Sequence, residues 1–241
     1  MKTYLQLLEE SLPDREHPRY AIWRAYALSG EERAMPIINK IQESIVLTSA
    51  KVLDLGCGDG GLTVALKQVG AKVVALDLDL SSTIRTKARL SEKNFPATVT
   101  NASADALPIA SNNLDVVIIQ DLIEHVSNPI RVLMEANRVL KVGGFCQLSV
   151  VNRIARTNIL SDPHWGLAGV ILMPRWLATW YVCKIRRRAQ YYNVWYIPTH
   201  QKLLKWLKTT NFTICNEEST SCNQFFNFSS SVLSIICFKT F

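Results

Sequence analysis

A glycine-rich turn between a strand-like run and a helix-like run constrains the fold of this chain most strongly. Residues 54–61 read Asp-Leu-Gly-Cys-Gly-Asp-Gly-Gly, and they join the apolar run Val52–Leu55 to the helix-like stretch Leu62–Val69. Glycines at this spacing allow a tight turn that brings backbone N–H groups and a helix N-terminus up to a ligand. The turn therefore predicts a strand–loop–helix unit that binds a small molecule.

The alternation that begins there continues to residue 151. Further strand-like runs lie at 72–76, 97–100, 114–119 and 145–151, and helix-like runs lie at 81–93 and 129–140. Strands that alternate with helices form βαβ units and a parallel sheet. We expect a later helix over Thr199–Thr209 and two strands, near 211–218 and 231–239, whose closeness in sequence favours antiparallel pairing.

The length of 241 residues suits a single α/β domain with added elements. We expect residues 1–48 to form an N-terminal helical cap, 50–151 the ligand-binding core, 152–197 an inserted lid, and 198–241 a closing helix and strand pair. The six cysteines are scattered without metal-ligand spacing, and the first residues lack the apolar segment of a signal peptide. These features predict reduced thiols, no metal site and a cytoplasmic protein.

Two carboxylates stand at strand ends beside the glycines. Asp54 lies two positions before Gly56, and Asp77 ends the second strand. An acid at the first position repels pyrophosphate but suits a ligand with a cationic amino-acid portion, and an acid at the second can hydrogen-bond ribose hydroxyls. S-adenosylmethionine, a nucleoside with a positively charged tail, meets both conditions.

These residues carry a resemblance to the class I S-adenosylmethionine-dependent methyltransferases. VLDLGCGDGGLT, ALDLDLS and ADALPIASNNLDVVI resemble successive motifs of that class, and DLIEHVSNPIRVLMEANRVLKVGG is similar to a segment of its type 11, UbiE/UbiG-like group. The resemblance covers residues 50–151 well and 199–239 loosely. It implies an α/β, Rossmann-like, mostly parallel seven-stranded sheet in the order 3-2-1-4-5-7-6, with the last strand antiparallel, and S-adenosylmethionine as cofactor.

The resemblance also implies roles for single residues around the first two strands. Asp54, Gly56 and Gly58 would cradle the methionine end of the cofactor. Asp77 would hold the ribose, and Leu78 would pack on the adenine.

Four further positions are implied by the same resemblance. Asp105, with the backbone at Ala104, would meet the adenine amine. Gln120 and Asp121, just past the fourth strand, would line the cofactor near its sulfonium. In contrast, we expect Asp59 only to cap the helix that follows the glycine turn.

Three polar residues after the fourth strand are candidates for acid–base catalysis. His125 either takes part in the reaction or is a helix-start residue held by hydrogen bonds. Asp162 and His164 flank a proline in the insertion, where they could act as orienter and base toward a weak nucleophile. The alternative is a turn in which the aspartate bonds its own backbone.

The insertion combines apolar, aromatic and basic residues. Residues 153–208 hold ten of the 27 Lys and Arg residues but one acid, Asp162, so they favour an anionic partner. The apolar, aromatic and basic pattern of residues 165–192 leaves two alternatives. The segment is either a lid that contacts a membrane surface and admits a lipid-like or lipid-linked acceptor, or a lid that only packs on the domain. A nucleic-acid partner is disfavoured because no RNA-binding module is appended.

The sequence therefore predicts a methyltransferase that acts on oxygen or carbon of a small-molecule or lipid-like acceptor, in the cytoplasm or peripherally at a membrane. An NAD-dependent oxidoreductase is an alternative because G-x-G-x-x-G is present, although Asp54 argues against it. An RNA methyltransferase and a non-catalytic methyltransferase-like subunit are further alternatives.

Overall fold

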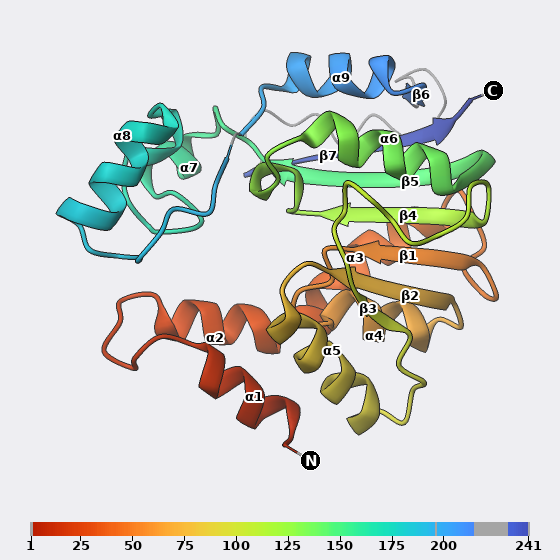
Figure 1. Cartoon of the computed structure of the whole chain (residues 1–241), viewed down its shortest axis with the longest axis horizontal. Coiled ribbons are helices and arrows are strands. Elements are labelled where there is room, and N and C mark those ends of the chain that lie inside the picture. The colour runs from red at the N-terminus through yellow and green to blue at the C-terminus, as the bar shows by residue number, and fades with distance from the viewer. Residues whose placement is uncertain (1, 196, 215–230, 241) are drawn as a thin grey trace. The chain divides into compact units, whose positions relative to one another are not determined.

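The computed structural model describes residues 2–195, 197–214 and 231–240 (Figure 1). The chain forms two compact units, the first made of residues 1–118 and 138–145 and the second of 119–137 and 146–241. The expectation of one domain over 1–241 stays a prediction, and each unit is described by itself.

The first unit opens with helices and continues with alternating strands and helices. Its elements are α1 (Tyr4–Ser11), α2 (Tyr20–Leu28), α3 (Gly30–Gln42), β1 (Lys51–Leu55), α4 (Gly61–Gln68), β2 (Lys72–Asp77), α5 (Leu80–Glu92), β3 (Val99–Asn101) and the start of β4 (Leu114–Gln120). Side-chain caps fix two of these helix starts. Thr3 and Gln6 form a reciprocal capping box on α1, and the carboxylate of Asp79 accepts the first N–H groups of α5.

Parallel pairing of β1, β2 and β3 places their carboxyl ends at one edge of the sheet. Lys51 pairs with Lys72 at one end of the β1–β2 ladder and Leu55 pairs with Leu76 at the other, while Asp77 pairs with Asn101 on β3. The apolar residues of β1 are buried on both faces of the strand, as expected for a strand covered by helices. The glycine turn leaves β1 at this carboxyl edge, which is where ligands bind in parallel sheets.

The second unit holds most of the predicted lid and the closing strands. Its elements are η1 (Ile123–His125), most of α6 (Pro129–Val139), the second half of β5 (Leu140–Val151), α7 (Arg156–Leu160), η2 (Val170–Leu172), α8 (Arg175–Thr179), the π-helix η3 (Trp180–Ile185), α9 (His200–Thr209), β6 (Phe212–Ile214) and β7 (Val232–Lys239). Residues 215–218 of the strand predicted near 211–218 lie outside the described residues.

The strands form one seven-stranded sheet in the order β3-β2-β1-β4-β5-β7-β6. β6 and β7 pair antiparallel, with Phe212 opposite Lys239 and Ile214 opposite Cys237. The strand order and the antiparallel closing pair predicted from the sequence are therefore confirmed.

The fifth strand begins earlier than predicted. β5 starts at Leu140, directly after α6, whereas the sequence predicted a helix up to residue 140 and a strand only from Phe145. Gly143 adopts a left-handed φ of +73°, a conformation typical of turns. The structure places this residue inside β5 and not in a connection before the strand. Lys141 pairs with Asp115 at the start of β4, which holds this exposed end of β5 in place.

The insertion packs part of its apolar surface and exposes the rest. Its buried residues include Trp165, Leu167, Val170, Ile171, Ala178 and Val182, and its exposed large residues include Leu172, Trp176, Trp180, Ile185, Tyr191 and Trp195. No helix among the described residues combines the length and the apolar character needed to cross a bilayer.

Candidate active site

The glycine turn is held in a conformation that favours glycine at three positions. Gly56, Gly58 and Gly60 have φ values of +82°, +51° and +75°. These left-handed conformations strain other residues, since a Cβ would crowd the following carbonyl. The N–H groups of Gly56 and Cys57 both donate to the carbonyl of Leu76, at 2.8 and 3.0 Å, so the turn is pinned to the end of β2.

Asp77 completes the connection between the turn and β2. One of its carboxylate oxygens accepts the backbone N–H of Gly58 at 2.9 Å, and the other accepts the N–H of Asp79 at 2.9 Å. Burial raises the pKa of the Asp77 carboxyl, and the two backbone donors counteract that rise. Each oxygen retains acceptor capacity, so the carboxylate can also receive the two hydroxyls of a ribose.

Asp54 is buried under the turn. The hydroxyl of Thr63, on the first turn of α4, donates to its carboxylate at 2.5 Å. Burial raises the pKa of Asp54 to about 7, and the negative charge of Asp77 adds to this effect. A cationic group brought near this carboxylate would be stabilised by it, because little water is present to screen the interaction.

The surroundings of Gly58 and Leu78 fit an adenosine group. A Cβ at Gly58 would meet no atom within 4 Å, so the backbone there faces open space. Leu78 is 70% exposed, which is unusual for a leucine directly after a buried strand, and it offers an apolar surface to a flat ring. The side chain of Asn101 holds the carbonyl of Leu78 at 2.8 Å and so fixes this segment.

The loop after β3 carries the residues expected at the adenine amine. Ser103 donates its hydroxyl to the carboxylate of Asp105 at 2.6 Å, and Ala104 lies half-buried between them. The role of Ala104 and Asp105 toward a cofactor stays a prediction.

Side chains of α5 hold the glycine turn from behind. The hydroxyl of Thr86 donates to the carbonyl of Gly58 at 2.9 Å, and Arg85 forms an ion pair with the carboxylate of Asp59 at 2.5 Å. The expectation that Asp59 caps α4 is therefore wrong. Gly60 is the N-cap and, lacking a side chain, gives no side-chain bond, while the Asp59 carboxylate pairs with the guanidinium of Arg85.

Gln120 and Asp121 lie in the second unit, where both contact Ser149 of β5. The Gln120 amide donates to the Ser149 hydroxyl at 3.4 Å, and that hydroxyl donates to the Asp121 carboxylate at 3.0 Å. Asp121 has a left-handed φ of +48°, a backbone outlier of the kind that gathers at functional sites. Their predicted contact with the cofactor sulfonium stays a prediction.

A cluster of polar groups in the second unit contains two of the three predicted catalytic residues. Ligand-capable atoms of Glu124, His125 and His164 all lie within 4.8 Å of one another, close enough to bind one cation or one polar group together. The carboxylate of Glu124 is fully buried and makes no hydrogen bond to a described residue. Burial raises its pKa to about 7, with the charge of Asp121 adding to the rise.

His125 is a neutral imidazole in this cluster. Burial, helped by His164, lowers its pKa to about 4. Its Nδ1 lies 3.1 Å from the carbonyl of Asn193, which can only accept, so Nδ1 carries the proton and Nε2 is the acceptor. The N–H of Trp195 donates to the carbonyl of Glu124 at 2.7 Å, so the segment after the lid helices fastens onto η1 at two points.

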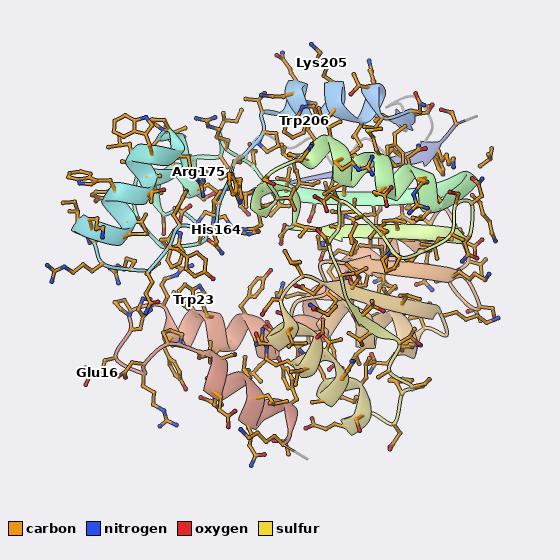
Figure 2. The ribbon with its side chains drawn as sticks, in the orientation of Figure 1. Glu16, Trp23, His164, Arg175, Lys205 and Trp206 are labelled. Carbon is orange, nitrogen blue, oxygen red and sulfur yellow. The ribbon has the colours of Figure 1, made fainter. Side chains whose placement is uncertain are left out.

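His164 and Asp162 form the pair anticipated in the insertion. Nδ1 of His164 lies 3.4 Å from one oxygen of Asp162, while the other oxygen accepts the N–H of Trp165 at 2.6 Å. The aspartate closes its own turn and also faces the histidine, so the turn is confirmed, while the role of the pair as orienter and base stays a prediction. The rings of His164 and His125 meet edge to face at 5.1 Å, so all three predicted catalytic residues lie in one region of the second unit, where Figure 2 labels His164.

Sequence reasoning missed Glu124 as a member of this cluster. Glu124 stands beside His125 in the sequence, but an acid a few residues past an apolar strand gives no direct indication of whether it is buried. That the chain holds no metal stays a prediction. Among the described residues, Glu124, His125 and His164 are the group whose ligand atoms lie close enough together to hold a metal ion.

Comparison with known proteins assigns the class of the core. Residues 53–148 match the family model described as a methyltransferase domain. A protein named ubiquinone biosynthesis O-methyltransferase from Stutzerimonas stutzeri is 32% identical over 117 residues, which are 48% of this chain and 50% of that protein. Its namesake from Methylococcus capsulatus is 31% identical over 140 residues, 55% of this chain and 58% of that protein. The chain thus matches only about half the length of these relatives.

Solved structures show the same fold at low sequence identity. A methyltransferase dependent on S-adenosylmethionine (SAM) from Aquifex aeolicus superposes with a TM-score of 0.60 at 12% identity, covering 98% of both chains. One from Mesorhizobium loti gives 0.61 at 19% identity, covering 84% of this chain and 96% of that one. The family match over residues 53–148 and the shared fold make this core similar to a class I methyltransferase domain. The cofactor of this class is S-adenosylmethionine.

Proposed function

We propose that this chain transfers a methyl group from S-adenosylmethionine to oxygen or carbon of a small-molecule or lipid-like acceptor. The observation that supports the proposal is the hydrogen bond between Asp77 and Gly58, which sets the carboxylate that we expect to bind ribose against a glycine turn. The relatives named ubiquinone biosynthesis O-methyltransferase support a lipid-like acceptor and transfer to oxygen.

In this proposal the residues of the first unit bind the cofactor. Asp54, Gly56 and Gly58 receive its amino-acid end, Asp77 its ribose, and Leu78 its adenine. The bound cofactor supplies an activated methyl group, so the chain mainly has to align the acceptor and exclude water.

We assign acid–base work to the polar cluster of the second unit. Asp162 orients His164 through Nδ1, so Nε2 of His164 is the atom that takes the proton of an acceptor hydroxyl. Neutral His125 and buried Glu124 offer hydrogen-bond acceptors to a second polar group of the molecule that is methylated.

We also assign a membrane contact to 165–192. Trp176 and Trp180 are 73% and 53% exposed, one helical turn apart, and a basic run at 184–188 follows. Exposed tryptophans beside basic residues suit the interface of an anionic bilayer, where the rings enter the headgroup region and the cations meet lipid phosphates.

Calorimetry with S-adenosylhomocysteine and with NAD tests the proposal directly. Saturable binding of S-adenosylhomocysteine without binding of NAD is the expected result. Binding of NAD alone would replace the methyltransferase with an oxidoreductase. Mass spectrometry of ligands that co-purify with the chain would then identify the acceptor class.

A further inference from the structure

Arg89 is a buried cation at the junction between the N-terminal helices and the glycine turn. It lies on α5, and its Nη1 donates to the carbonyl of Asp59 in the turn at 3.2 Å. The same nitrogen donates to the carbonyl of Ala27 at 3.0 Å and to the hydroxyl of Tyr4 at 3.1 Å, and Nη2 donates to the carbonyl of Leu28 at 3.3 Å. One guanidinium therefore contacts α1, the end of α2 and the turn.

The charge of Arg89 is balanced from the same helices. Its Nε lies 3.2 Å from the carboxylate of Glu31, on the first turn of α3, and its guanidinium lies 4.6 Å from the centre of the Tyr4 ring. A buried cation needs such partners because it has lost its water shell. The position of the guanidinium consequently depends on α1, α2 and α3 being in place.

The backbones of the two regions also touch. A Cβ at Gly61, the first residue of α4, would lie 2.5 Å from both Cα and the carbonyl carbon of Gly30, the first residue of α3. Only the absence of side chains permits this approach. The start of α3 therefore rests directly on the helix that the glycine turn leads into.

Residues of α5 on either side of this junction set the shape of the turn. Thr86 holds the carbonyl of Gly58, and Arg85 holds the side chain of Asp59. Arg89, one helical turn after Arg85, holds the backbone of Asp59 as well as the N-terminal helices. A displacement of those helices would thus reach the turn through Arg89.

We propose that Arg89 is a positioning residue that couples the docking of α1–α3 to the cofactor affinity of the glycine turn. The inference rests on the proposed function, because it concerns the site assigned there to S-adenosylmethionine. Coupling of this kind is reciprocal, so cofactor binding also stabilises the docked N-terminal helices.

The test uses calorimetric titration of the full chain with S-adenosylhomocysteine. Arg89→Lys keeps the charge but cannot reach all of these carbonyls, and it should weaken affinity about tenfold, within the usual range of coupling between sites. Tyr4→Phe removes one acceptor of Arg89 and should weaken affinity by a smaller factor. Arg24→Ala is the matched control, since Arg24 pairs with Glu9 within the N-terminal helices and no contact links it to the turn among the described residues.

Hydrogen–deuterium exchange separates coupling from general destabilisation. In the wild-type chain, S-adenosylhomocysteine should slow exchange over Tyr4–Ser11, and in Arg89→Lys this protection should disappear. Unchanged affinity in a folded Arg89→Lys variant overturns the inference. If that variant does not fold, unchanged affinity and protection in Tyr4→Phe overturn it instead. A wild-type chain that does not bind S-adenosylhomocysteine overturns the proposed function, and the inference falls with it.

Discussion

The carboxylate of Asp77 and the backbone N–H of Gly58 lie 2.9 Å apart, which joins the end of β2 to the glycine turn. Asp77 therefore has two functions in the proposed site, since it shapes the turn and offers acceptors to a ribose. Removing the Asp77 side chain should therefore disturb the turn and also remove the acceptors for the ribose.

Asp77→Ala should weaken binding of S-adenosylhomocysteine by at least about tenfold, as expected for losing hydrogen bonds to a charged group. Isothermal calorimetry measures the change. Asp115→Asn serves as a control, because Asp115 binds the N–H of Lys51 and the side chain of Lys141 at the start of β4. Equal affinity in wild type and Asp77→Ala would remove the ribose assignment.

Cofactor affinity should depend on pH through Asp54. Burial raises the pKa of this carboxyl to about 7, so it is mostly protonated at pH 6 and mostly ionised at pH 8. An ammonium group of the ligand favours the ionised form, so affinity for S-adenosylhomocysteine should rise over this interval in the wild type. The rise should be much smaller in Asp54→Asn, and an equal rise in both proteins would contradict the assignment.

Glu124 should reduce stability at alkaline pH. Its pKa is raised from 4.5 to about 7, so the folded chain binds a proton more tightly than the unfolded chain, and the free energy of unfolding falls as pH rises through this window. Glu124→Gln should therefore be more stable than wild type at pH 8 and similar to it at pH 4. Urea denaturation at the two pH values measures this difference, and a variant less stable at pH 8 would show that the carboxylate has a partner.

His164→Ala should lower turnover while leaving affinity for S-adenosylhomocysteine within about twofold of wild type, because positioned bases contribute mainly to the chemical step. The loss should be on the order of a hundredfold. The comparison variant is Asp162→Asn, which retains an acceptor for the N–H of Trp165 but weakens the orientation of His164. Full turnover in His164→Ala would show that Asp162 and His164 only form a structural turn and take no part in catalysis.

Replacing Trp176 and Trp180 with serine should reduce co-sedimentation with vesicles that contain phosphatidylglycerol. The exposed rings supply the apolar part of the proposed contact, and the basic run at 184–188 supplies the charged part. Binding by the wild type should also weaken at high salt. Ile22→Ser is a suitable control, since it removes an exposed apolar residue from α2 instead. Wild-type protein that stays in the supernatant at low salt would eliminate the membrane contact.

Local patterns were sufficient to predict the alternating strands and helices and the glycine turn, while the strand order was implied by the family resemblance. The run Val52–Leu55, the glycines after it and the acid at Asp77 are close in sequence, and their order along a βα unit fixes where they meet. Parallel pairing of β1 and β2 then brings Asp77 next to Gly58, so this contact can be predicted without knowledge of any contact between distant residues.

Contacts between distant residues could not be predicted in this way. Arg89 carries no motif, and its partner carbonyls at Ala27 and Leu28 lie at the end of α2, about sixty residues earlier. Glu124 resembles a surface acid in the sequence, and its contact with the N–H of the distant Trp195, made through its backbone carbonyl, has no sequence signal. Asp59 was assigned to the nearest helix start because its true partner, Arg85, lies on the next helix.

The π-helical turn at Trp180–Ile185 determines the direction in which the side chains after it point relative to those of α8. The N–H of Arg186 bonds the carbonyl of Tyr181, five residues earlier, whereas an α-helix would use a residue four earlier. One additional residue in this turn rotates everything after it by about 100° relative to α8. Deleting Val182 would therefore rotate Arg186 and the residues after it by about that angle relative to Trp176 while leaving the composition of the segment nearly unchanged.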